Sequence, residues 1–260
     1  MYVSKVQLKN IRGIGPKGLT FDFTKTVTGG RGKFAGWTVV AGPNGAGKTT
    51  LLQGMAGALV GGPGSNWLLR PDDRRDWVHH GKRPGTQGDQ GTACTWVEWG
   101  PGDPIPARER RLDPVPLLVE WGRDASFSRN VPPEGEHSFV LRHFWNAGNA
   151  GDKADGWLFA GYGPHRGNPR TSPDAALLYR SAARAASVVS LFRDDAGLEA
   201  ANLWLVELEI GAGRAGGARE KALRDGVLQL LGCGLLEEGQ QTRMRVEAEG
   251  LQVEWDGGWR

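Results

Sequence analysis

One nonapeptide constrains the fold of this chain more than any other stretch: Gly42-Pro43-Asn44-Gly45-Ala46-Gly47-Lys48-Thr49-Thr50. It fits the pattern Gly-x-x-x-x-Gly-Lys-Ser/Thr. An apolar run, residues 37–41, precedes it, and residues 48–60 follow with apolar side chains at helical spacing. The order predicts a strand, a glycine-rich turn and a helix, and therefore an α/β fold.

The residue types in this stretch predict a phosphate site. Gly42, Gly45 and Gly47 lack a Cβ atom, so the backbone can take positive φ angles and turn its N–H groups inward around an anion. The start of the helix adds unsatisfied N–H groups, and the Lys48 ammonium can reach β- and γ-phosphate oxygens. We expect Thr49 to give its hydroxyl to Mg²⁺ and Thr50 to lie near the α-phosphate. The predicted nucleotide-binding residues are thus Gly42, Pro43, Asn44, Gly45, Ala46, Gly47, Lys48, Thr49 and Thr50; the alternative is an accidental match by a glycine-rich turn.

Composition narrows the class only broadly. The 260 residues are 39% apolar, enough for one large domain or two modest ones, and no apolar run is long enough to span a membrane. The first residues lead into a strand pattern rather than a signal peptide, so a cytoplasmic location is expected. Cys94 and Cys233 stand far apart and are expected to be reduced thiols. A net charge of +3 with nearly balanced signs gives only a weak indication of nucleic-acid binding.

Two further strands are predicted before the loop. Residues 3–11 alternate apolar and polar, Arg12 and Gly13 end that strand, and residues 19–23 alternate again after a turn. An antiparallel pair is expected, followed by a hairpin loop at 28–33 and the loop strand at 37–41.

This series, with "LKNIRGI", "LTFDF" and "GPNGAGKTT", resembles the start of the RecF-like and SMC-like branch of ABC-type ATPases, which includes AAA-family ATPases of DNA repair and phage defence. The resemblance is strongest over residues 3–60. It implies ATP as the nucleotide and a P-loop head lobe in which antiparallel strands flank the P-loop sheet, with a helical subdomain beyond it. It also makes Arg12 a candidate contact to adenine or phosphate, although a solvated arginine at a strand end fits the sequence equally well.

Downstream of the loop, the helix is expected to stop at Gly61-Gly62-Pro63-Gly64. Strands are predicted around 92–99, 115–121 and 137–141, where the family has a small antiparallel sheet flanking the nucleotide. His79-His80 is expected to be an exposed loop pair, since adjacent side chains rarely chelate one metal.

A buried strand is predicted at 156–160, leading into Gly161-Tyr162-Gly163-Pro164-His165-Arg166. This string resembles a motif in a subset of defence-type ATPases. Its place in the chain is roughly that of a glutamine which, in ABC-type ATPases, senses Mg²⁺ and the γ-phosphate, but no glutamine is present here. Tyr162 and Arg166 are therefore candidate nucleotide contacts, with a structural turn as the alternative.

The remaining residues predict helices over 173–192, 198–210 and 218–231, with breaks at 211–213 and 232–234, and then a hairpin over 243–255. The expected division is a P-loop lobe with an antiparallel β subdomain (1–170), a helical subdomain (171–238) and a C-terminal β-hairpin (239–260).

Two elements of a competent hydrolase are not found. An apolar strand ending in Asp-Glu would hold Mg²⁺, but the nearest matches, 117–120 and 203–207, lack the paired acid, and 203–207 fits a helix better. A Leu-Ser-Gly-Gly-like signature is also missing. In the family both come later in the chain, so the resemblance covers the amino-terminal half, and no catalytic residue is identified. A truncated chain, a natural split ATPase and a module that binds without hydrolysis all fit.

The leading hypothesis is therefore an ATP-binding half of a RecF-like or SMC-like ATPase in a DNA-linked or phage-defence complex. Hydrolysis would need a partner or second half with the signature motif and the Walker B acid, which implies an oligomer or hetero-complex. The alternative is a protein-interaction module stabilised by nucleotide, and a small metabolite kinase fits less well.

Overall fold

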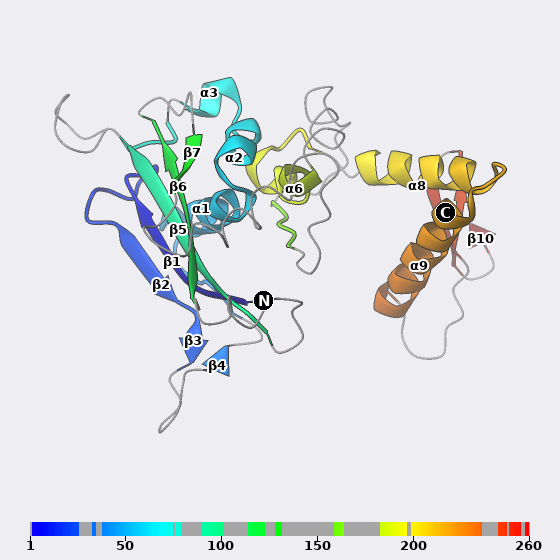
Figure 1. Cartoon of the computed structure of the whole chain (residues 1–260), viewed down its shortest axis with the longest axis horizontal. Helices are drawn as coiled ribbons and strands as arrows, with labels where there is room; N and C mark the ends of the chain where they lie inside the picture. Colours follow the sequence, from blue (N-terminus) through cyan, green and yellow to red (C-terminus); the bar gives the residue numbers. More distant parts are fainter. Residues whose placement is uncertain are drawn as a thin grey trace. The chain divides into compact units, whose positions relative to one another are not determined.

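The computed structural model of the chain describes residues 2–25, 33–34, 38–74, 76–79, 90–100, 114–122, 128–131, 159–163, 183–196, 199–235, 244–248, 250–255 and 258–259. Its contacts divide it into two compact units (Figure 1). The first comprises Met1–His165 with Leu177–Asp194, and the second comprises Arg166–Ala176 with Asp195–Arg260.

The first unit is built on a five-stranded sheet with the order β2-β1-β5-β6-β7. Every neighbouring pair in this sheet is antiparallel, with Val6 opposite Phe21 on one side of β1 and opposite Thr95 on the other. The antiparallel pair predicted before the loop is confirmed, and so are the strands predicted near 92–99 and 115–121. The five strands are β1 (Tyr2–Lys9), β2 (Leu19–Asp22), β5 (Gly91–Glu98), β6 (Val115–Trp121) and β7 (Ser128–Val131).

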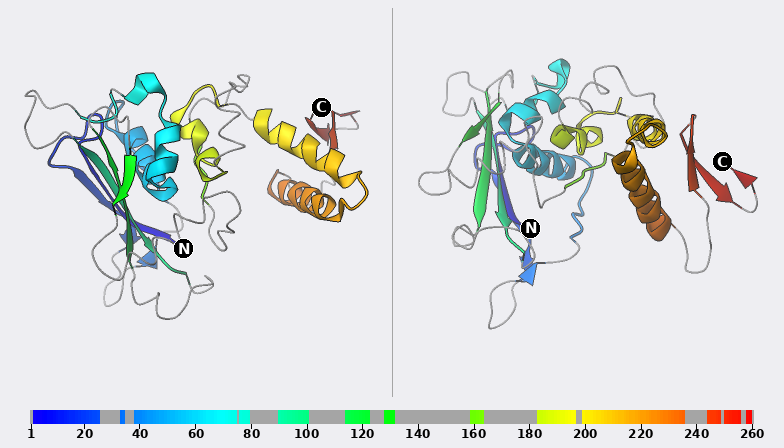
Figure 2. Two further views of the ribbon diagram at one scale, coloured as in Figure 1. Left: turned by 45° about the horizontal axis from the view of Figure 1, so that its top comes forward. Right: turned by 45° about the vertical axis from the view of Figure 1, so that its right-hand side comes forward.

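Alternation along the strands gives the sheet one apolar face. Val6 and Leu8 on β1 are fully buried, whereas Lys5 and Gln7, which alternate with them, are half-exposed. On β6 the odd-numbered positions from Val115 to Trp121 are fully buried in the same way. The helices of this unit lie on one side of the sheet, as its nearly edge-on view shows (Figure 2, right). The α/β class predicted from the sequence is confirmed.

Helix α1 (Lys48–Val60) is the helix predicted after the loop, and it packs closely on the sheet. Gly54 and Gly57 make this close approach possible, because they lie one turn apart on its inner face. A Cβ atom on Gly54 would collide with the Leu8 side chain, and one on Gly57 would lie 3.0 Å from the Trp121 ring. Helix α1 is thereby held close to β1 and β6.

An aromatic pair fills the core below α1. The fully buried rings of Trp77 and Trp121 meet edge to face, with centroids 5.4 Å apart and planes at 73°, and Phe192 lies 5.9 Å from Trp77. Such pairs add to the stabilisation that burial itself gives. This cluster draws residues from distant parts of the sequence into one core.

Short elements surround this core. The predicted stop at Gly61 is confirmed, but Gly62–Leu68 then forms a second helix, α2, where a turn was expected. Pro63 explains the difference, since proline at the first positions of a helix loses no hydrogen bond. The others are α3 (Pro71–Arg74), α6 (Ala183–Ala186), α7 (Val189–Phe192) and a two-stranded ribbon of β3 (Thr24–Lys25) and β4 (Lys33–Phe34).

Two predicted strands are not found in the residues that the structure describes. Residues 38–41 and 159–160, the described parts of the strands expected at 37–41 and 156–160, have no strand structure. A buried parallel strand needs a neighbour on each side, and all strand pairs in the described ranges are antiparallel. Val39 accordingly remains 83% exposed, while Val40 packs on the edge of the core. The strand predicted at 137–141 and the hairpin loop at 28–33 lie almost wholly outside the described residues.

The second unit combines two helices with a three-stranded sheet of order β10-β9-β8. The hairpin predicted over 243–255 is confirmed. Helix α9 was expected to end near Leu231, but it continues through Gly232-Cys233-Gly234, since glycine weakens a helix without ending it. The elements are α8 (Glu199–Ala212), α9 (Ala218–Leu235), β8 (Met244–Glu247), β9 (Gly250–Trp255) and β10 (Gly258–Trp259).

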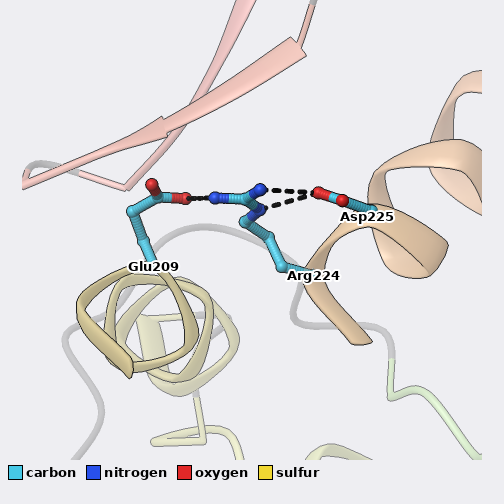
Figure 3. Close-up of polar contacts among 3 residues, drawn as sticks. All are labelled: Glu209, Arg224 and Asp225. Atoms are coloured by element: carbon cyan, nitrogen blue, oxygen red, sulfur yellow. Dashed lines mark hydrogen bonds and ion pairs between the residues drawn. The ribbon is translucent and has the colours of Figure 1, made fainter. Parts of the chain in front are cut away.

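A guanidinium joins the two helices of this unit. Arg224 on α9 donates to Glu209 on α8 at 2.7 Å and to its neighbour Asp225 at 2.7 and 2.9 Å (Figure 3). These hydrogen bonds raise the pKa of Arg224 above its ordinary value. No helix in the described part of the chain is long and apolar enough to cross a membrane.

Candidate nucleotide-binding site

The loop before α1 has the backbone of an anion-binding turn. Gly45 and Gly47 have φ angles of 81° and 86°, which glycine adopts without strain. The Ala46 N–H donates to the Pro43 carbonyl at 3.2 Å, and the helix begins with the Leu51 N–H on the Gly47 carbonyl at 2.8 Å. The first N–H groups of α1 therefore open toward the loop, where an anion is favoured.

Gly42 differs from the expectation for the three glycines, because its φ angle is not positive. A Cβ atom there would only make an ordinary contact, at 3.5 Å, with the Ala46 side chain. Gly42 contributes its carbonyl group to the loop, where this group accepts a hydrogen bond from Lys48.

Lys48 folds back over the loop. Its Nζ atom donates to the Gly42 carbonyl at 2.7 Å and to the Pro43 carbonyl at 2.8 Å. Two neutral carbonyls are weaker partners for an ammonium group than phosphate oxygens, which make charge-assisted hydrogen bonds. The side chain can therefore exchange these bonds for a phosphate.

The surroundings of the loop fit a triphosphate with Mg²⁺. Residues 41–46 are all exposed, and no atom lies within 4 Å of the Cβ positions of Gly45 and Gly47. Thr49 is exposed and offers a hydroxyl to a hard cation, whereas Thr50 is 8% exposed. When bound, Mg²⁺ would supply positive charge next to the phosphates.

Sequence comparison agrees with this geometry. Residues 5–95 match the family model described as an AAA domain. The amino-terminal part of the chain is therefore similar to AAA domains. This AAA segment, residues 5–95, contains most of β1, all of β2, the loop and α1, and most of β5. The resemblance predicted from the sequence is confirmed at this level.

Several solved structures are similar to this chain. One similar structure comes from work titled for ATP-driven dimerization and DNA-stimulated activation of SMC ATPases; it is 20% identical, covers 54% of this chain and 78% of its own, and has a TM-score of 0.35. Another is an SMC head bound to the C-winged helix domain of ScpA, with 14% identity, 97% and 67% coverage and a TM-score of 0.45. No curated protein matches the sequence.

Arg12 of the AAA segment is held more firmly than a solvated arginine would be. It has a φ angle of 49°, its N–H donates to the Trp77 carbonyl at 2.8 Å, and its guanidinium lies 5.1 Å from the Trp77 ring centroid. Burial lowers the pKa of Arg12, and the carboxylates of Asp73 and Asp76 partly oppose that effect. The group stays charged, because an arginine is not deprotonated in proteins.

His79 is part of the same contact and is not the exposed loop residue that was predicted. It is half-buried, and its Nδ1 atom lies 2.7 Å from the Arg12 carbonyl. A carbonyl only accepts, so Nδ1 carries the proton. The Val78–Ile11 bridge explains the difference, since it draws His79 onto the end of β1. His80 lies outside the described residues.

Tyr162 lies on a turn that is attached to α7 and its preceding residues. Its side chain is 64% exposed, while Gly163 beside it is buried. The Gly161 N–H donates to the Ser187 carbonyl at 2.9 Å. Arg166 lies outside the described residues.

The two acidic matches at 117–120 and 203–207 do not supply the missing carboxylate pair. Glu120 on β6 accepts from Arg129 at 2.7 and 2.9 Å, on the sheet face opposite the buried Val119. Glu207 lies on α8, which agrees with the helix expected for that run. In the part of the chain that the structure describes, no group of three or more His, Cys, Asp or Glu side chains could hold a metal.

Sequence reasoning missed Gln53, which lies five residues after Lys48 on α1. It is 4% exposed and binds the Leu191 carbonyl at 2.8 Å. A signal was available: Gln53 falls on the apolar face of the helix together with Ala56 and Val60, where a polar residue is unusual.

Proposed function

We propose that this chain binds ATP with Mg²⁺ at residues 42–50 and is the amino-terminal half of a RecF-like or SMC-like ATPase. The observation that carries the proposal is the position of Lys48, whose ammonium lies across the loop at 2.7 and 2.8 Å from two carbonyls, at the start of a helix. A positive helix end, two glycines with positive φ and the Lys48 ammonium within one loop favour a polyphosphate over other ligands.

The proposed roles follow the chemistry of each side chain. Lys48 contacts the β- and γ-phosphates, the backbone N–H groups between Gly45 and Thr50 surround them, and Thr49 binds Mg²⁺. Arg12 and Tyr162 are proposed as outer contacts. Arg12 suits a phosphate because its guanidinium lies over the Trp77 ring, while His79 holds its backbone carbonyl.

Another polypeptide segment must complete the active site, because hydrolysis needs an acid near Mg²⁺ and a group that orients water. We propose that a partner subunit or a second half supplies the signature segment and the Walker B acid. Such a complex would act in DNA repair or phage defence, as the sequence resemblance implies. A filter-binding titration with duplex DNA at increasing salt tests the DNA part, and no affinity at low salt would remove it.

A ligand series tests the phosphate site directly. Calorimetry should show that ATP and inorganic tripolyphosphate, each with Mg²⁺, bind the wild-type chain, whereas AMP binds at least about tenfold more weakly, because AMP lacks the two phosphates that Lys48 contacts. Equal affinity for AMP and ATP would contradict the assignment of the loop.

A second candidate function is a protein-interaction module that nucleotide only stabilises. Exposed apolar side chains on α8 favour it: Leu203, Trp204 and Ile210 are 55%, 42% and 54% exposed. If a complex purified with the native partner persists unchanged with Lys48→Ala and without nucleotide, this reading replaces the first.

A further inference from the structure

The helix that follows the loop, α1, buries the amide side chain of Gln53. Gln53 is 4% exposed, and its Nε2 atom donates to the Leu191 carbonyl, 138 residues away in sequence, at 2.8 Å. Its Oε1 atom is also buried and has no hydrogen-bond partner in the described structure. Packing alone does not favour such a residue, because an unpartnered buried amide oxygen opposes folding.

The Leu191 end of this bond belongs to a segment that carries a second attachment. Residues 187–191 contact the turn 161–163 through two hydrogen bonds. The Gly161 N–H donates to the Ser187 carbonyl at 2.9 Å, and the Ser190 hydroxyl donates to the Gly161 carbonyl at 3.4 Å. The fit is close, since a Cβ atom on Gly163 would collide with the Ser190 carbonyl, and one on Gly161 would lie 3.2 Å from the Leu191 side chain.

These contacts form one continuous connection within the first unit. It runs from Lys48 along α1 to Gln53, across the hydrogen bond to Leu191, and through Ser190 to the turn that exposes Tyr162. An α-helix rises about 1.5 Å per residue, so Gln53 lies roughly 7.5 Å along the axis from Lys48. A small displacement of α1 at the loop therefore acts on the Leu191 carbonyl through a rigid element.

We propose that Gln53 is a positioning residue that couples nucleotide occupancy of the loop to the 161–163 turn. The proposal rests on the proposed function, because it requires ATP to bind at residues 42–50. With Mg²⁺–ATP bound, α1 is held by the phosphates, Gln53 fixes the Leu191 carbonyl, and the turn closes more firmly on residues 187–191. Tyr162 is then presented in one orientation only when nucleotide is present.

Hydrogen–deuterium exchange measures this coupling, because the Gly161 N–H exchanges more slowly when its hydrogen bond to the Ser187 carbonyl is held more firmly. In the wild-type chain, saturating Mg²⁺–ATP should slow exchange of the 159–163 peptide at least about fivefold, the low end of typical coupling between sites. Gln53→Met keeps the length of the side chain and removes the donor. It should still bind ATP within about tenfold of wild type, while ATP no longer slows exchange at 159–163.

Three further variants separate the possible outcomes. Gln53→Leu, which has neither a donor nor an acceptor, should behave like Gln53→Met, and covers the case in which either variant folds poorly. Gln229→Met, an exposed glutamine on α9, should keep the full response. Lys48→Ala should lose both binding and response.

The results distinguish this proposal from the function on which it rests. If wild type binds ATP and the 159–163 peptide does not respond, or if Gln53→Met responds as wild type does, the coupling is overturned and the ATP site stands. If wild type does not bind ATP, both fall. A purely structural Gln53 would change exchange equally with and without nucleotide, and that result also contradicts the proposal.

Discussion

Cys94 lies on β5 with 7% of its surface exposed, and burial raises the pKa of its thiol to about 12. In the unfolded chain the thiol has its ordinary pKa, near 9.0. Below that pH the thiol is neutral in both states, and its contribution to stability is fully present. As pH rises toward 12 the unfolded state ionises first, so the contribution is lost.

The loss of stability with rising pH can be measured. Between pH 8 and pH 10.5, the free energy of unfolding of wild type should fall by about 2 kcal/mol more than that of Cys94→Ala, because each pH unit above the unfolded pKa is worth about 1.36 kcal/mol. Urea titrations of both proteins at the two pH values measure the difference. Parallel pH dependence in both would show that the thiol is not buried as described.

At single residues, the sequence predicted the conformation of the loop far better than the long-range contacts around it. Gly45, Gly47 and Lys48 stand in a motif whose spacing dictates their local conformation. Gln53 and His79 form contacts with residues 138 and 67 positions away. The spacing of neighbouring residues in the sequence cannot reveal contacts over such distances. Arg12 lay between these cases: its place at the end of β1 was predictable, but the Trp77 ring beside it was not.

The packing of α1 on the sheet depends on a residue with no side chain. Gly54→Ala should destabilise the chain by about 1–3 kcal/mol, because the new Cβ would collide with Leu8 on β1 and overpacking has costs of this size. Gly226→Ala on α9 is the matched control: no atom lies within 4 Å of its Cβ position, and alanine should stabilise this helix by about 0.5–1 kcal/mol.

Chemical denaturation of the two alanine variants measures both signs. If Gly54→Ala is as stable as wild type, α1 does not approach β1 as closely as described. If Gly226→Ala is also destabilising, the loss at Gly54 cannot be attributed to the contact with Leu8.

Among the elements, those with a complete local pattern were predicted well. Helix α1 begins and ends where capping and spacing predicted, and β1, β2 and the 243–255 hairpin alternate in sequence and in the sheet. The predicted strand at 37–41 failed for a non-local reason: its apolar residues suit a buried strand, but no neighbouring strand is described beside it. Pro63 at the start of α2 was taken for a terminator because proline serves both purposes.

For the whole molecule, we predict that ATP binds without efficient turnover. The purified chain should hydrolyse little or no ATP, because no paired acid is identified for Mg²⁺ and water, and Glu120 is engaged by Arg129. A phosphate-release assay with Mg²⁺–ATP measures the rate, with Lys48→Ala as the background. Robust turnover that disappears in Lys48→Ala would mean that this chain contains its own catalytic acid.

At this scale the sequence predicted a P-loop ATPase resemblance for the amino-terminal part, and the AAA match over 5–95 agrees. The arrangement of the elements after residue 95 was harder to predict from the sequence. The helices near 183–192 are short and belong to the first unit's core through Phe192, a placement that only the Trp77 contact reveals.

The most direct measurement is the affinity of Mg²⁺–ATP for three proteins: wild type, Lys48→Ala and Lys221→Ala, the last an exposed lysine on α9. Isothermal calorimetry should find that Lys48→Ala binds at least about tenfold more weakly than wild type, because charge-assisted bonds to phosphate contribute about 1.5 kcal/mol or more. Lys221→Ala should bind as wild type does. Equal affinity in all three proteins would contradict the central claim that residues 42–50 bind the nucleotide.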